Sequence, residues 1–132
     1  MKIAFCFPGQ GSQDVGMGRA IAERFPEARA VYDEASEAVG YDVAQVCFEG
    51  PIEKLTRTDV QQPALVATSL ACLRAVDTIG VRPDFVVGHS VGEYSRSPPP
   101  LRFPTGTRSR SSRSGDGRWR RLQTAIRAQW RR

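Results

Sequence analysis

The stretch Asp84-Phe85-Val86-Val87-Gly88-His89-Ser90-Val91-Gly92 decides the fold of this chain. Residues 84–87 indicate a buried strand, in which the apolar run Phe85-Val86-Val87 follows Asp84, and a Gly-x-Ser-x-Gly segment follows this strand directly. This order is typical of a nucleophile elbow, in which a serine stands on a sharp turn between a strand and a helix. Glycines two residues to either side of Ser90 remove side chains that would collide in such a turn. The stretch therefore predicts an α/β fold with Ser90 as a catalytic nucleophile.

A second strand is expected at the start of the chain, where residues 3–7 form another short apolar run. A glycine-rich turn follows it, over residues 8–13. Between the two expected strands, the sequence predicts helices near residues 17–25, 26–39, 42–48, 52–55 and 63–79. Pro26 and Pro63 are each expected in the first turn of a helix, and Gly40 at the end of one. Strand, helices and strand in this order predict a parallel sheet.

The glycine-rich turn, Gly9-Gln10-Gly11-Ser12-Gln13, has a backbone that can approach a ligand closely. One of its N–H groups could serve as an oxyanion-hole donor opposite the N–H of Val91. A nucleotide phosphate loop is the competing interpretation. It fails because the spacing requires glycine at position 14, where the chain has Asp14, and no Gly-Lys-Ser/Thr follows. A turn without any role in binding is the remaining alternative for this segment.

Polar residues also open the longest expected helix, at Gln61-Gln62-Pro63-Ala64. Side chains there could reach the carboxyl edge of the sheet, where open α/β folds bind ligands. Glutamines that face only solvent are the alternative. His89, the one histidine of the chain, is adjacent to Ser90, so its side chain should point away from the serine. We expect His89 to line the site rather than to act as the general base, which normally comes from a distant segment.

Metal, membrane and secretion signals are weak in this sequence. The cysteines, Cys6, Cys47 and Cys72, form no Cys-x-x-Cys pair, so we expect buried free thiols in a reducing cytoplasm and no metal site. No apolar run approaches the roughly 18 residues of a membrane-spanning helix. The apolar run at the N-terminus is too short for a secretory signal. These features favour a cytoplasmic protein without membrane association.

The net charge of +5 over 132 residues hides two regions of opposite character. Residues 1–95 carry 8 lysines and arginines against 13 acidic residues, whereas residues 96–132 carry 11 arginines and one acidic residue. The second region is rich in Arg, Pro and Ser and poor in apolar residues, which predicts a disordered basic tail. A nucleic-acid-binding tail is the alternative function for this region.

Taken together, three segments resemble the bacterial malonyl-CoA:acyl carrier protein transacylases. They are Phe7-Pro8-Gly9-Gln10-Gly11-Ser12-Gln13, Gln62-Pro63-Ala64-Leu65 and Gly88-His89-Ser90-Val91-Gly92-Glu93-Tyr94-Ser95. The resemblance covers residues 1–95 and implies the N-terminal part of an acyltransferase domain similar to α/β-hydrolases. The start at Met1 is similar to the free-standing enzymes rather than to a polyketide synthase module.

The resemblance also implies a reaction. Ser90 would take the malonyl group from malonyl-CoA as an ester and pass it to the phosphopantetheine thiol of acyl carrier protein, in fatty-acid synthesis. The amides of Gln10 and Val91 would form the oxyanion hole, and Gln62 and His89 would line the pocket. No bound cofactor is implied, and the full-length enzyme is expected to be a monomer. A serine esterase is the alternative, although it does not account for the glycine-rich turn.

The sequence departs from the family after Ser95. The family has a histidine base and a carboxylate-binding arginine beyond the elbow, but no histidine follows Ser90 here. We expect that residues 96–132 are a frame-shifted reading of the family's own gene, since shifted GC-rich alanine codons yield arginine and proline. We therefore expect a truncated chain with negligible malonyl transfer.

Overall fold

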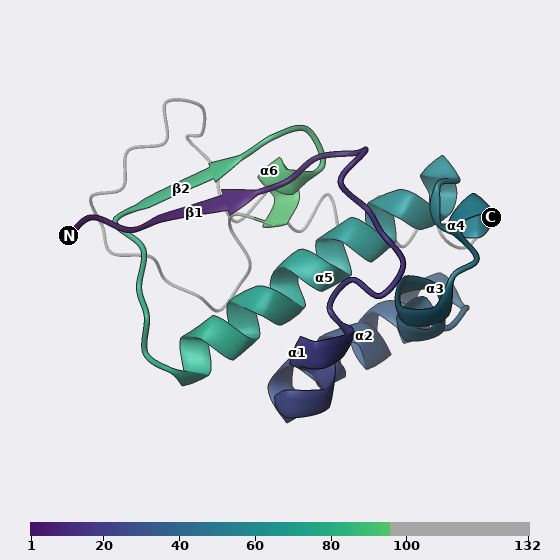
Figure 1. Ribbon diagram of the computed structural model, residues 1–132, viewed down its shortest axis with the longest axis horizontal. Coiled ribbons are helices and arrows are strands. Elements are labelled where there is room, and N and C mark those ends of the chain that lie inside the picture. Colours follow the sequence, from purple (N-terminus) through teal and green to yellow (C-terminus); the bar gives the residue numbers. More distant parts are fainter. Residues whose placement is uncertain (96–132) are drawn as a thin grey trace.

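The computed structural model describes residues 1–95, in which a parallel pair of strands lies beside a layer of helices (Figure 1). The expectations about residues 96–132, including a disordered basic tail and a frame-shifted reading, lie outside the described residues. The elements in chain order are β1 (Ala4–Phe7), α1 (Arg19–Arg24), α2 (Pro26–Val39), α3 (Val43–Glu49), α4 (Ile52–Leu55), α5 (Thr58–Thr78), β2 (Phe85–Gly88) and α6 (Gly92–Ser95). The predicted α/β class and the parallel pairing are confirmed.

The two strands run in parallel with a fixed register, Ala4 opposite Phe85 and Phe7 opposite Gly88. Asp84 fixes the start of the pair, because its carboxylate accepts from the Ile3 amide at 2.9 Å and from Lys2 Nζ at 2.8 Å. Parallel strands end at the same edge of a sheet. The glycine-rich turn after β1 and the serine segment after β2 therefore emerge side by side.

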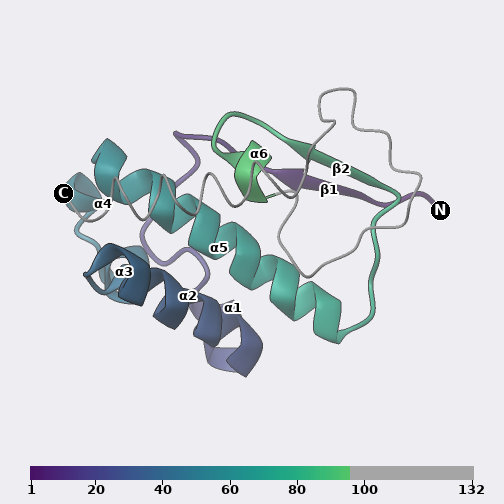
Figure 2. The same cartoon turned by 180° about the vertical axis from the view of Figure 1, so that it is seen from behind.

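The prediction that both strands are buried is wrong for the described residues. Phe85 and Val87 remain 55% and 52% exposed, and Cys6 is exposed as well, which also corrects the expectation that every cysteine is buried. The reason is that α5 and the helices beyond it lie on one side of the sheet (Figures 1 and 2). Within residues 1–95, the other face has no covering layer, although parallel sheets usually have both faces covered.

The core lies between α5 and the helices α1 to α4. Tyr32, Val43 and Leu55 are fully buried there, with Cys47 beside them. The side chains of α5 that face this core are small. Ala67, Ala71 and Ala75 are buried in this core, whereas Leu70 and Val76 are half-buried. Small side chains let α2 pack closely against α5, which gives the sheet a rigid base.

The start of α5 differs from the prediction. The helix begins at Thr58, so Pro63 lies inside it rather than in its first turn. A proline there removes one helical hydrogen bond. Packing against α2, α3 and α4 compensates for the missing bond, because Val60 and Pro63 are both buried. Tertiary contacts thus extend the helix one turn beyond the position that local signals indicate.

Other helix ends follow the sequence signals. The Asp42 side chain accepts from the Gln45 amide at 2.8 Å and caps α3. Gly40 ends α2 in the left-handed conformation, with φ of 80°, and Pro26 occupies the first turn of α2. Helix α1 begins at Arg19, two residues later than Met17, because Gly18 is left-handed with φ of 77°. The signals at Asp42, Gly40 and Pro26 held because each depends on a few neighbouring residues, whereas the predicted start of α1 was two residues too early.

Candidate active site

Ser90 stands on a strained turn between β2 and α6. Its φ of 53° makes it the one non-glycine residue with a positive φ in the described part of the chain. The Gly92 amide donates to the His89 carbonyl at 2.8 Å, and the Glu93 amide donates to the Ser90 carbonyl at 3.0 Å. The left-handed region costs an L-residue about 1–2 kcal/mol. The predicted elbow geometry is therefore present, with Ser90 exposed at its tip.

The two flanking glycines are required by close backbone contacts. A Cβ added to Gly88 would lie 2.5 Å from the Gly92 carbonyl oxygen. One added to Gly92 would collide with the carbonyl oxygens of Phe7 and Pro8. The end of β1 thus passes directly against the elbow, and the His89 amide donates to the Phe7 carbonyl at 3.1 Å. The Gly-x-Ser-x-Gly spacing serves both the turn and its contact with β1.

The glycine-rich turn lies against the serine. A Cβ on Gly9 would be 3.2 Å from Ser90 Cβ and 2.6 Å from His89 Nδ1. The turn is shaped by the Ser12 hydroxyl, which donates to the Gly9 carbonyl at 2.7 Å, and by Gly11, with φ of 97°. The structure therefore brings together two motifs that lie 80 residues apart, as the parallel register requires.

Gln61, which the sequence indicated only as one of several polar residues at the start of the long helix, connects this turn to α5. Gln10 Nε2 donates to Gln61 Oε1 at 3.2 Å, and Gln61 is only 7% exposed. Gln62, the glutamine chosen from the sequence, is the next residue of α5 and is half-buried. Helical spacing was the available signal, since Gln61 and the buried Leu65 are four residues apart and share one face of α5.

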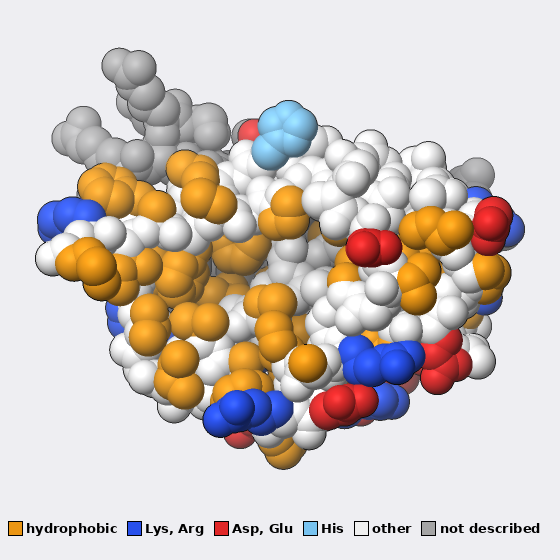
Figure 3. Space-filling view, in the orientation of Figure 1, with side chains coloured by type: hydrophobic (Ala, Val, Ile, Leu, Met, Phe, Trp, Pro, Cys, Tyr) orange, Lys and Arg blue, Asp and Glu red, His pale blue; other side chains and the backbone are white. Residues whose placement is uncertain are grey.

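Val91 and His89 occupy opposite environments beside Ser90. Val91 is buried against Leu65 and Val66 of α5, which holds its backbone at the start of α6. His89 is exposed, and the pale blue side chain in Figure 3 lies on the surface. The exposed side chain of His89, next to the serine, is in a position to form the rim of the site.

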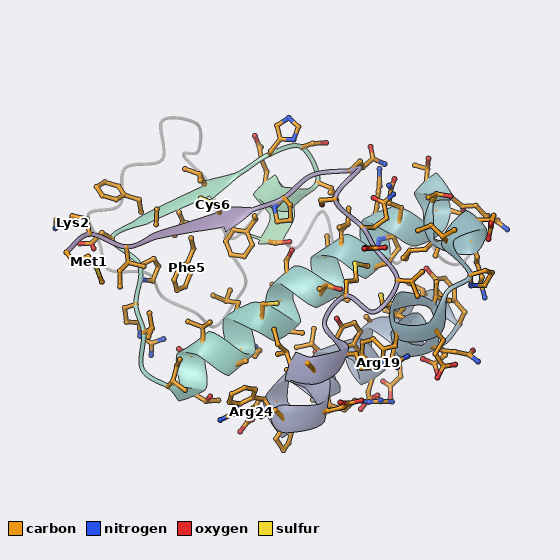
Figure 4. All side chains as sticks on the ribbon, in the orientation of Figure 1. Met1, Lys2, Phe5, Cys6, Arg19 and Arg24 are labelled. Carbon is orange, nitrogen blue, oxygen red and sulfur yellow. The ribbon has the colours of Figure 1, made fainter. Side chains whose placement is uncertain are left out.

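A cavity of about 360 Å³ lies between β1 and α5, and Figure 3 shows it as a hollow lined by apolar side chains. Phe5 points from β1 toward it in Figure 4. Its lining includes Ser12 of the glycine-rich turn, but it includes neither Ser90 nor Gln10. The hollow is therefore an opening between the sheet and its helix layer, separate from the serine.

The described residues contain neither a metal-binding cluster nor a membrane-spanning helix. Within residues 1–95, no three His, Cys, Asp or Glu side chains gather into a group that could hold a metal ion. None of the helices in this range has both the length and the apolar character needed to cross a membrane.

Comparison with known proteins gives a consistent result. Residues 4–97 match the family described as the acyl transferase domain. The malonyl CoA-acyl carrier protein transacylase of Bacillus subtilis is 50% identical over 94 residues, which are 71% of this chain and 30% of that protein. The chain therefore spans about a third or less of the length of such relatives.

Solved structures agree with this match. The acyl-carrier-protein-S-malonyltransferase of Bartonella henselae superposes with a TM-score of 0.69 at 44% identity, over 74% of this chain and 32% of that one. A malonyl-transacylase solved with a type II polyketide synthase acyl-carrier protein has a TM-score of 0.69 at 43% identity. That match covers 74% of this chain and 32% of the other.

Proposed function

The chain belongs to the acyl transferase domain family, and from this we propose that its serine site is built for malonyl transfer from coenzyme A to acyl carrier protein. The observation that carries the proposal is the strained Ser90, with φ of 53°, packed against Gly9 of the glycine-rich turn. This is the arrangement that a serine nucleophile and an adjacent oxyanion site need. Fatty-acid and polyketide synthesis both use the transfer.

The reaction proceeds in two halves. Ser90 Oγ attacks the thioester carbonyl of malonyl-CoA, the C–S bond breaks, and coenzyme A leaves as the thiol with the serine proton. The phosphopantetheine thiol of acyl carrier protein then attacks the malonyl ester, and Ser90 regains its proton. Malonyl-CoA is the substrate, and no bound cofactor takes part.

The oxyanion of each tetrahedral intermediate is held by the amides of Gln10 and Val91. Both residues follow strands that end at the same edge, and Gly9 contacts Ser90 directly, which supports this assignment. Gln62 and His89 line the pocket around the malonyl group. Removal of a single oxyanion donor typically lowers the rate by about a hundredfold to a thousandfold.

The 132-residue chain is proposed to be inactive in this transfer as it stands. It has no histidine after Ser90 to act as the base, because its one histidine is His89. A serine without its base loses several orders of magnitude in rate. Recovery of a malonyl ester on Ser90 after incubation of the purified chain with malonyl-CoA would overturn this part of the proposal.

A chimaera tests the site itself. Residues 1–95 of this chain are joined to the remaining residues of the Bacillus subtilis relative, and malonyl transfer to acyl carrier protein is measured by mass spectrometry. We expect transfer in the chimaera and none in its Ser90→Ala variant. Hydrolysis of p-nitrophenyl esters without malonyl transfer would instead favour the serine esterase.

A further inference from the structure

We propose that Gln61 is a positioning residue that fixes the glycine-rich turn against Ser90 by holding the side chain of Gln10. The inference rests on the proposed function for its catalytic meaning, since it concerns the turn that carries one oxyanion amide. Gln61 does not itself contact Ser90 in this assignment and acts through Gln10.

The first observation is a buried amide with an exposed partner. Gln61 is 7% exposed, which is unusual for a glutamine, and its Oε1 accepts from Gln10 Nε2 at 3.2 Å. A buried polar group without a partner is costly, so burial of Gln61 favours the conformation in which Gln10 reaches it. Gln10 itself is exposed, and nothing about its own burial requires that conformation.

The second observation is what else holds the turn. The Ser12 hydroxyl donates to the Gly9 carbonyl at 2.7 Å, and the Gly11 amide donates to Gln13 Oε1 at 2.9 Å. Both bonds lie within the turn, so they shape it without attaching it to a neighbour. Among the hydrogen bonds of the described residues, the bond between Gln10 and Gln61 is the one that ties residues 9–13 to another element.

The third observation is that the anchor point is rigid. Gln61 lies on the 21-residue helix α5, which packs against α2 through a buried alanine stripe. The turn, in contrast, contains Gly9 and Gly11, which give its backbone unusual freedom. A side chain held at its far end restricts rotation of its own backbone. The anchored Gln10 side chain therefore restricts the Gly9–Gln10 peptide, whose N–H is the proposed oxyanion donor.

Hydrogen exchange of residues 9–13 in the full 132-residue chain tests the anchor without any substrate. Gln61→Leu should raise exchange in the turn by about threefold to tenfold, the range expected for loss of one hydrogen bond. Gln61→Glu keeps an acceptor oxygen of the same reach, so it should raise exchange less than Gln61→Leu does. Gln45→Leu, on an exposed position of α3, is the matched control and should change nothing in the turn.

Gln10→Leu breaks the same bond from its exposed side, so it remains informative even if Gln61→Leu unfolds the chain. It should raise exchange in the turn as Gln61→Leu does, and the double variant should add nothing further. Equal exchange in the Gln10→Leu variant and in the unmodified chain would overturn the proposal. Additive effects of the two substitutions in the double variant would overturn it as well.

The same variants in the chimaera give the catalytic readout. If Gln61 positions the turn, Gln61→Leu should lower kcat of malonyl transfer with little change in KM, and Gln61→Glu should restore it. A chimaera without malonyl transfer would contradict the proposed function, while the exchange experiment would still decide whether Gln61 anchors the turn. Unchanged kcat in an active Gln61→Leu chimaera would overturn the positioning role.

Discussion

Gly9 packs directly against Ser90, with 3.2 Å between Ser90 Cβ and the position that a Cβ on Gly9 would occupy. This contact joins the turn after β1 to the elbow after β2. It exists because the two strands are parallel neighbours with Phe7 opposite Gly88. The contact leaves no room for a side chain at position 9, which leads to the first prediction.

Gly9→Ala should displace the glycine-rich turn from the elbow. The added methyl group would lie 2.9 Å from the His89 carbonyl oxygen, a backbone atom that cannot move without the elbow. We expect a loss of about 1–3 kcal/mol in the free energy of unfolding, the usual cost of overpacking, measured by urea titration. Gly11→Ala is the control for backbone strain, because φ is 97° there and no atom lies within 4 Å. Equal exchange protection of the elbow in both variants would contradict the prediction.

Ser90→Gly should stabilise the chain, whereas Ser90→Ala should not. Both changes remove the hydroxyl group, but only glycine relieves the strain of a φ of 53°. We expect Ser90→Gly to raise the free energy of unfolding by about 1 kcal/mol relative to Ser90→Ala. Thermal unfolding of the two variants side by side is the measurement. Equal stability would show that the elbow is not strained in solution.

The three thiols should differ in their reaction with a thiol reagent. Cys6 is exposed on β1 and should react first, followed by the partly buried Cys72. Burial raises the pKa of Cys47 to about 12, so at pH 8 its reactive thiolate is scarce as well as inaccessible. Mass mapping after brief alkylation should find Cys47 unmodified until urea unfolds the helix layer. Early labelling of Cys47 would contradict the packing of α3 against α5.

The Asp84 carboxylate should contribute to stability only above acidic pH. Its hydrogen bond from Lys2 Nζ, followed by that from the Ile3 amide, lowers its pKa below the ordinary 3.8. Because the pKa of Asp84 is lower in the folded state, the carboxylate adds to the free energy of unfolding when the pH is above the pKa of the unfolded chain. This stabilisation is lost as the pH falls through the pKa of the folded state.

Asp84→Asn is the test of that pH dependence. The variant should melt at a lower temperature than the unmodified chain at pH 6, and the difference should shrink as pH falls below about 4. A difference that persists at pH 2 would show that the amide cannot replace the carboxylate for reasons other than charge.

Local chemistry in the sequence determined much of this protein. The elbow was predictable because its glycines and its serine are contiguous and its turn is a local event. The same holds for the cap at Asp42 and the stop at Gly40, each of which depends on a few adjacent residues. The sequence also placed the ends of α2, where Pro26 and Gly40 mark them.

Only the tertiary structure decided how distant segments meet. The start of α5 at Thr58 depends on packing that overrides Pro63, and the choice of Gln61 over Gln62 depends on which face of α5 turns toward the glycine-rich turn. The exposure of Phe85 and Cys6 likewise depends on which sheet face the helices cover. Burial and contacts between distant segments are set by elements that lie far apart in the sequence. The sequence by itself therefore determined which residues form the serine site, and the fold alone determined which of them touch.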